Sequence, residues 1–280
     1  MSDITPALVG KLRELTNAGL MDCKNALVET KGNLDGAIDI LRKKGAASAA
    51  KKAGRDAKDG LIAQAVSANG KIGVLVEVNC ETDFVARNDS FKAFCSDLAA
   101  KIAVDRKANL EADRVAAVAK IGENIQIRRH QRLEVKGNGL VAAYIHTGSK
   151  VGVLVEVGAG KEATVLSEAF KQLVRDITLQ IAAASPVSIS RDDVSPAVLE
   201  KEKEIATQSD AVKGKPPQAV AKIIEGKLAK FFETSCLLEQ GFVKNPELKV
   251  SAHIGATAKL LADEIKIHCF VRFQVGETIA

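Results

Sequence analysis

The run KIGVLVEV at residues 71–78 decides the fold, because it returns 79 residues later as KVGVLVEV at residues 150–157. The match continues upstream at the same spacing, where GLIA at 60–63 corresponds to GLVA at 139–142. Similarity of this length at constant spacing indicates two copies of one structural unit, and a repeat sets the architecture of a chain. The units that contain these two runs are called copy one and copy two below.

Each copy predicts a β-hairpin, a helix and a third strand. In copy one, two apolar runs at 61–66 and 72–78 flank an Asn-Gly turn signal, which is typical of a hairpin. Apolar residues at helical spacing follow, and a closing strand is expected at 125–135 in copy one and at 265–275 in copy two. These elements predict an α+β core of two hairpin–helix–strand units, with antiparallel sheets and a pseudo-twofold relation.

The first 45 residues predict a bundle of three short helices. Thr5-Pro6 marks the start of the first helix, Asp22 is expected to cap the second and Asn33 the third, and Gly45 is expected to end the third helix. Helices this short are not stable alone, so they must pack against one another. The Ala- and Lys-rich segment 46–59 that follows is expected to be a solvated helix or a linker.

A second helical attachment interrupts copy two. The charged segment 192–208 carries a proline at a helix start, GKPP at 214–217 predicts a turn, and 219–232 returns to apolar residues at helical spacing. The apolar stripe is narrow, which favours an antiparallel, coiled-coil-like hairpin over a buried core. We expect this insertion at about 187–232.

The chain is therefore expected to divide into three parts. The three-helix bundle spans 1–52, the first half of the core spans 53–138, and the second half with its insertion spans 139–280. The length of 280 residues allows this division, since domains typically contain roughly 100–200 residues. A content of 46% hydrophobic and 27% charged residues is that of a globular protein with a real core.

The residue types that carry chemistry form no recognisable active site. The five cysteines are odd in number and widely spaced, and the four histidines lack metal-ligand spacing, which argues against a disulfide framework and a zinc site. Signatures of hydrolases, metalloproteases and phosphate-binding loops are missing from the sequence. We expect no bound metal, no cofactor and no enzyme activity.

Charge and hydropathy limit the partners. The net charge of +5 permits a nucleic-acid partner, but an aromatic content of 4% leaves little for stacking bases, so no direct nucleic-acid binding is expected. The basic segment 51–58 keeps open the alternative of an RNA- or ribosome-binding accessory protein. No apolar run approaches the ~20 residues that span a bilayer, and no secretory signal begins the sequence, so we expect a cytoplasmic protein without a membrane partner.

The two copies differ most just after their second strand. Copy one continues as NCETDFVARND at 79–89, whereas copy two has GAGKEA at 158–163. Because the copies share a framework, we expect that the copy-one segment is not needed to build it. Phe84 in this strand-to-helix loop either folds back into the core or projects as an aromatic anchor for a partner. His146, at a hairpin turn, is either solvated or an interface contact.

The sequence Thr82-Asp83-Phe84-Val85, with VEVN at 76–79 before it, resembles the elongation factor Ts family of guanine-nucleotide exchange factors for elongation factor Tu. The likeness covers nearly the whole chain and includes AGLMDCKNAL at 18–27, KIGENI at 120–125 and VRFQVGE at 271–277. It implies a bacterial-type translation factor with an N-terminal domain like ubiquitin-associated domains, a two-part core and a coiled-coil hairpin. Some family members continue into a further helix where this sequence stops.

The resemblance also implies which residues act. Asp83 and Phe84 match the pair that intrudes beside the partner's nucleotide site, and Thr82, Asp83, Phe84 and Val85 together match the segment credited with dislodging magnesium. Further partner contacts fall, by the same match, on six residues: Arg13, Leu20, Met21, Ile121, Gly122 and His146. The implied partner is elongation factor Tu, and the resemblance leaves open a larger complex that contains two partner molecules. The implied protein promotes GDP release until GTP displaces it.

Overall fold

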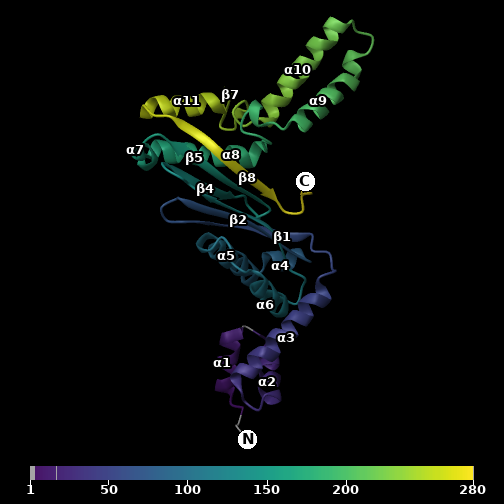
Figure 1. Ribbon diagram of the computed structural model, residues 1–280, viewed down its shortest axis with the longest axis vertical. Coiled ribbons are helices and arrows are strands. Elements are labelled where there is room, and N and C mark those ends of the chain that lie inside the picture. The colour runs from purple at the N-terminus through teal and green to yellow at the C-terminus, as the bar shows by residue number, and fades with distance from the viewer. Residues whose placement is uncertain (1–3, 17, 280) are drawn as a thin grey trace.

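The molecule is elongated in the computed structural model, which describes residues 4–16 and 18–279 (Figure 1). Three helices occupy the N-terminal end: α1 (Pro6–Thr16), α2 (Leu20–Glu29) and α3 (Leu34–Lys52). The predicted cap of α3 is confirmed, because the Asn33 side chain accepts a hydrogen bond from the Gly36 backbone N–H at 3.1 Å. Buried apolar residues of all three helices form one small core.

Two details of this end of the chain were predicted wrongly. Helix α2 begins at Leu20 after Gly19, so Asp22 lies in its first turn and does not cap it. Helix α3 does not end at Gly45 but continues as one helix to Lys52. Gly45 is buried against a later helix, α6 (Glu111–Ile121), where an added Cβ would lie 3.4 Å from Val115. The glycine marks a close helix contact, which a local pattern does not distinguish from a helix end.

The core consists of two three-stranded antiparallel sheets, as predicted. In copy one, β1 (Asp59–Val66), β2 (Ile72–Cys80) and β3 (Gln126–Glu134) pair in that order. In copy two, the order is β4 (Gly139–Ile145), β5 (Val151–Ala159) and β8 (Ile265–Gln274). Each middle strand carries a register shift at the same repeat position, after Glu77 and after Glu156. The α+β class and the duplicated unit are thus confirmed.

The two sheets pack face to face, and each has helices on its outer face (Figure 1). Helix α5 (Asp89–Val104) and α6 cover the first sheet, and α8 (Glu168–Ala184) covers the second. Side chains of β2 alternate, so that Val74 and Val76 face the helices while Leu75 faces the other sheet. Burial on both faces explains the nearly continuous apolar runs of β2 and β5.

Contacts between the copies are reciprocal, as a pseudo-twofold relation requires. The Ile62 N–H donates to the Ser149 carbonyl at 2.8 Å, and the Val141 N–H donates to the Gly70 carbonyl at 2.7 Å. Both pairs exchange under the 79-residue spacing of the repeat. Lys71 and Lys150 follow the same rule, since each ammonium group binds a backbone carbonyl at the first glycine of the other copy.

The insertion in copy two forms the protruding helical hairpin that the sequence predicts. Helices α9 (Pro196–Gln208) and α10 (Pro217–Ser235) run antiparallel and extend away from the sheets (Figure 1). The Ser195 hydroxyl caps α9 by accepting from the Val198 N–H at 3.3 Å. A small sheet of β6 (Gly241–Phe242) and β7 (Asn245–Lys249), followed by α11 (Val250–Leu261), leads back to β8. The prediction missed these last elements and α6.

None of the described helices is both long enough and apolar enough to span a membrane.

Candidate functional site

The segment that carries Phe84 is a one-turn helix, α4 (Asp83–Arg87), between β2 and α5. Copy two forms the same turn at the corresponding place, as α7 (Glu162–Leu166). The shared framework therefore includes this turn, and copy two builds it without the Thr-Asp-Phe-Val sequence of copy one, as expected. What differs is the side chain: Phe84 of copy one is replaced by Ala163 in copy two.

Phe84 projects into solvent, with 80% of its surface exposed. The next two residues hold the turn down, since Val85 is half-buried against the core of copy one and Ala86 is buried within it. Successive residues of a helical turn point about 100° apart, so burying these two directs Phe84 outward. Of the two sequence interpretations, the structure selects the projecting aromatic side chain.

Short polar contacts fix the start of α4. The Thr82 hydroxyl accepts a hydrogen bond from the Val85 N–H at 3.3 Å, which is an N-cap. Asp83 forms an ion pair with Arg87 at 2.8 Å across one turn. The Cys80 thiol donates to the Thr82 carbonyl at 3.2 Å, and burial raises the pKa of this thiol to about 12, so that it keeps its proton.

A loop from the end of α6 binds the same turn. Gly122 ends α6 in a left-handed conformation with φ of +88°, and Glu123 then reaches the turn. One Glu123 oxygen accepts from the Glu81 and Thr82 N–H groups at 3.0 and 3.1 Å. The other accepts from the Thr82 hydroxyl at 2.6 Å. These bonds place the predicted contacts Ile121 and Gly122 beside the Phe84 turn.

The turn between β4 and β5 lies on another side of α4. Gly148, Ser149 and Lys150 of this turn line one pocket together with Asp83 and Arg87. His146 starts the same turn and is exposed, with its Nδ1 atom 3.1 Å from the Tyr144 hydroxyl oxygen. Thr82–Val85 and Ile121–Gly122 therefore lie together at α4, and His146 lies at the start of the turn whose later residues, Gly148–Lys150, line a pocket with α4.

Comparison with known proteins now identifies the family. A family model described as elongation factor TS matches residues 81–277, so the matched region begins at the Phe84 turn. The chain belongs to the elongation factor Ts family. Members of this family are translation elongation factors and act in protein biosynthesis.

Curated relatives named elongation factor Ts match almost the entire chain. The protein of Trichlorobacter lovleyi is 45% identical and the alignment covers 98% of this chain and 93% of that protein. The protein of Symbiobacterium thermophilum is 44% identical, with 100% and 94% covered. The protein of Nitratidesulfovibrio vulgaris is 41% identical, with 99% and 97% covered. The likeness thus includes the N-terminal bundle, which the family model leaves out.

The remaining site residues suggested by the resemblance to elongation factor Ts lie on the N-terminal bundle. Leu20 and Met21, at the start of α2, are 54% and 62% exposed, and Arg13 is exposed in the last turn of α1. Helix α3 separates the bundle from the sheets and α4 (Figure 1). The structure therefore places the ten residues in two separate regions, one on the bundle and one around α4.

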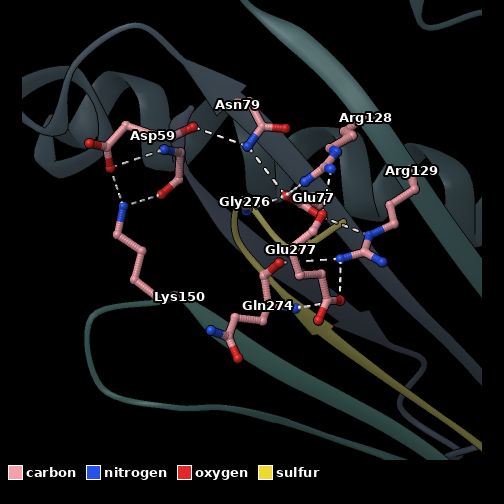
Figure 2. A network of polar contacts seen from close by, with 10 residues as sticks. Asp59, Glu77, Asn79, Arg128, Arg129, Lys150, Gln274, Gly276 and Glu277 are labelled. Atoms are coloured by element: carbon pink, nitrogen blue, oxygen red, sulfur yellow. Dashed lines mark hydrogen bonds and ion pairs between the residues drawn. The ribbon is translucent and has the colours of Figure 1, made fainter. Parts of the chain in front are cut away.

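A buried polar network ties the two copies together near the site (Figure 2). Glu77 is fully buried and accepts hydrogen bonds from Arg128 at 3.1 Å and Arg129 at 2.7 Å. Arg129 also pairs with Glu277, beyond β8, at 2.5 Å. On the other side, Glu77 accepts from the Asn79 amide at 3.3 Å, which extends the network toward Asp59 and Lys150.

Sequence reasoning missed Glu123 and the roles of Glu77 and Glu81. Glu123 lies within the family-like run KIGENI, which was the only signal that could have found it. Glu77 is identical to its repeat partner Glu156. This identity indicated a residue of the shared framework, but it did not indicate which groups Glu77 contacts. Within the described part of the chain, His, Cys, Asp and Glu side chains form no group of three or more that could hold a metal ion.

Proposed function

We propose that this protein is a guanine-nucleotide exchange factor that binds GDP-bound elongation factor Tu and promotes GDP release. The observation that carries the proposal is Phe84, a large aromatic side chain that a member of the elongation factor Ts family exposes on a firmly held turn. Exposed aromatic side chains on rigid turns are effective anchors in protein interfaces. The partner's nucleotide site is the proposed target of this anchor.

Linkage between two binding equilibria explains the activity. A factor that binds its partner more tightly in the nucleotide-free state must weaken nucleotide binding by the same ratio. Only a difference in affinity is needed, so the factor requires no catalytic group and is not an enzyme in this proposal. GTP displaces the factor by the same reciprocity.

Phe84 would act as a wedge beside the partner's magnesium and phosphate site, together with Thr82, Asp83 and Val85. Displacing the elements that hold the cation leaves the negative charge of the phosphates uncompensated, which favours nucleotide release. Arg13, Leu20 and Met21 on the bundle would hold the partner at a second place. Ile121, Gly122 and His146 would contact it around the wedge. Two separated contact regions fix the orientation in which Phe84 enters.

The first prediction concerns Phe84→Ala. Loss of a central aromatic anchor typically costs about 2 kcal/mol or more, which corresponds to roughly a 30-fold slower release of GDP. The measurement is stopped-flow release of a fluorescent GDP from elongation factor Tu. Excess EDTA should reduce the difference in GDP release rate between the wild type and Phe84→Ala, because EDTA removes the magnesium ion without the help of Phe84.

Val104→Ala is the matched control for this variant. Val104 is also a large apolar residue in copy one, 89% exposed at the end of α5, and its loss should leave the stimulated rate unchanged. Equal release rates for Phe84→Ala and the wild type would remove the wedge from the mechanism.

The alternative of an RNA- or ribosome-binding accessory protein has weaker support. Within the basic segment 51–58, Arg55 pairs with Glu81 at 3.4 Å and Lys58 pairs with Asp56 at 2.7 Å, so two of its cations are already offset by acidic partners. Filter binding to RNA over a range of salt concentrations separates the two functions. Phosphate contacts would give a steep loss of affinity with rising salt.

A further inference from the structure

We propose that Glu123 is the positioning residue of the exchange site: its carboxylate sets the direction in which Phe84 projects. This inference rests on the proposed function of Phe84. It adds a residue that does not need to touch the partner and that acts through the turn carrying the aromatic side chain.

Helix α4 is too short to hold its own shape. The first N–H groups of a helix find no acceptor within the helix, and a single turn has few other hydrogen bonds, so its direction depends on how the preceding backbone is held. Glu123 accepts from the N–H groups of Glu81 and Thr82, at 3.0 and 3.1 Å. Hydrogen bonds to a charged acceptor are stronger than those between neutral groups. The carboxylate therefore orients the backbone that enters α4.

Glu123 also orients the N-cap of α4. The Thr82 hydroxyl donates to Glu123 at 2.6 Å and accepts from the Val85 N–H at 3.3 Å. The hydroxyl can serve the cap only in one rotamer, and the bond to Glu123 selects that rotamer. Glu123 thus acts on the backbone before Phe84 directly and on the N–H of Val85, the residue after it, through the Thr82 hydroxyl.

The contact between the α6 loop and the turn is reciprocal. A Glu81 oxygen accepts from the Asn124 N–H at 2.6 Å, so two glutamates each bind the backbone beside the other. The side-chain amide of Asn124 also donates to the Arg55 carbonyl at 2.8 Å. This bond ties in the segment that connects α3 to β1. The turn is therefore held against two other parts of copy one, and a change of its direction would break several bonds at once.

The repeat supplies a comparison within the same molecule. In copy two, an Asp263 oxygen accepts from the Lys161 N–H at 2.9 Å, and Lys161 occupies the place of Thr82. A lysine side chain has no acceptor with which to cap a helix. The turn that carries Ala163 thus lacks the hydroxyl that links carboxylate and cap, whereas the turn that carries Phe84 has it. In copy two the Asp263 carboxylate bonds instead to the side chain of Thr164, inside α7, and α7 has no side-chain cap. The link from carboxylate to N-cap is therefore found in the copy that presents the aromatic side chain.

The direct test uses fluorescence and needs no partner. The sequence contains no tryptophan, so Phe84→Trp places a single tryptophan at the tip of the turn. Adding Glu123→Ala should lower the steady-state anisotropy of this tryptophan and increase its quenching by acrylamide. Adding Asp263→Ala should change neither quantity, because it releases the turn of copy two. An unchanged anisotropy in the Glu123→Ala background would overturn the proposal.

The functional test separates positioning from binding. With Phe84 in place, Glu123→Ala should lower the maximal rate of stimulated GDP release about 10-fold, since small misplacements of an acting group have effects of this size or larger. The factor concentration that gives half-maximal stimulation should change far less. Asp263→Ala should leave both quantities at their wild-type values. A change in the half-maximal concentration alone would show that Glu123 is an ordinary contact.

Two further variants guard against simple unfolding. Thr82→Val keeps the shape of the side chain and removes only the hydroxyl, so it should lower the rate in the same direction as Glu123→Ala but less, because the two backbone bonds to Glu123 stay. Thr82→Ser should restore most of the rate. Circular dichroism checks that each variant melts as a folded protein. If the wild type itself fails to stimulate GDP release, the proposed function fails, while the anisotropy still decides whether Glu123 orients the turn.

Discussion

Glu77 is a carboxylate with no exposed surface, surrounded by groups from both copies. Burying a charge is costly unless it is paired, and here Arg128 and Arg129 supply the pairing. Its repeat partner Glu156 is half-buried, and the Cys269 thiol, which lies 3.8 Å away, donates to it. Identical residues at equivalent positions therefore have different surroundings, because the copies differ in the strands that close them.

A prediction at the residue scale follows for Glu77→Gln. Removing the charge leaves two arginines without their common partner, and we expect a loss of about 2–4 kcal/mol in the free energy of unfolding. This is near the lower end of the range for broken buried pairs, because both arginines keep part of their surface in water. Urea denaturation provides the measurement. Glu156→Gln is the control and should cost clearly less; a similar cost for both variants would contradict the assigned role of the network.

Helix α3 illustrates the scale of the element. It has 19 residues and links the bundle to the first strand of the core. Its alanine-rich second half has a high helix propensity, which carries the helix through Gly45 although a glycine inside a helix costs roughly 0.5–1 kcal/mol relative to alanine. The contact with α6 explains why a small residue is found there, since Val115 and Ala119 lie close to the place of a Cβ.

For α3 we predict that a small and a large substitution at Gly45 change the stability of the protein in opposite directions. Gly45→Ala should stabilise the protein by about 0.5 kcal/mol, because the methyl group meets Val115 at an ordinary contact distance and the helix propensity rises. Gly45→Leu should destabilise it, because the larger side chain forces α3 away from α6. Thermal melting of the two variants measures both effects. A destabilised Gly45→Ala would show that the helices have no room for a methyl group.

At the scale of the whole molecule, the packing of the two sheets depends on glycines at equivalent places. A Cβ on Gly73 would lie 2.3 Å from a Val141 methyl carbon, and a Cβ on Gly152 would lie 2.6 Å from an Ile62 methyl carbon. Such distances are impossible without movement, so the glycines allow each sheet to approach the other. The pseudo-twofold relation makes the same requirement appear twice.

We therefore predict that Gly73→Ala lowers the free energy of unfolding by about 1–3 kcal/mol, as overpacking does in other cores. Chemical denaturation with guanidinium chloride measures the change. Gly255→Ala on α11 is the control, because a Cβ at Gly255 would meet open space among the described residues, and it should be neutral or slightly stabilising. If Gly73→Ala were as stable as the wild type, the sheets would not be in the close contact described above.

Elements that depend on neighbouring residues could be predicted from the sequence. The repeat, its strands, the helical hairpin and the cap at Asn33 are local patterns, because side chains alternate along a strand and recur at 3–4 residues along a helix. The motif around Phe84 also identified the family, and the comparisons confirmed it.

The contacts between residues that are far apart in the chain became known from the folded molecule. Whether Phe84 projects depends on Val85 and Ala86 finding places in the core of copy one. The direction of the turn depends on Glu123, which lies far along the chain and is brought to Thr82 by the pairing of β2 with β3. Whether Gly45 ends a helix or allows a close helix contact depends in the same way on α6. Contact energies act between residues that are close in space, and a local pattern contains no information about which distant residues those are.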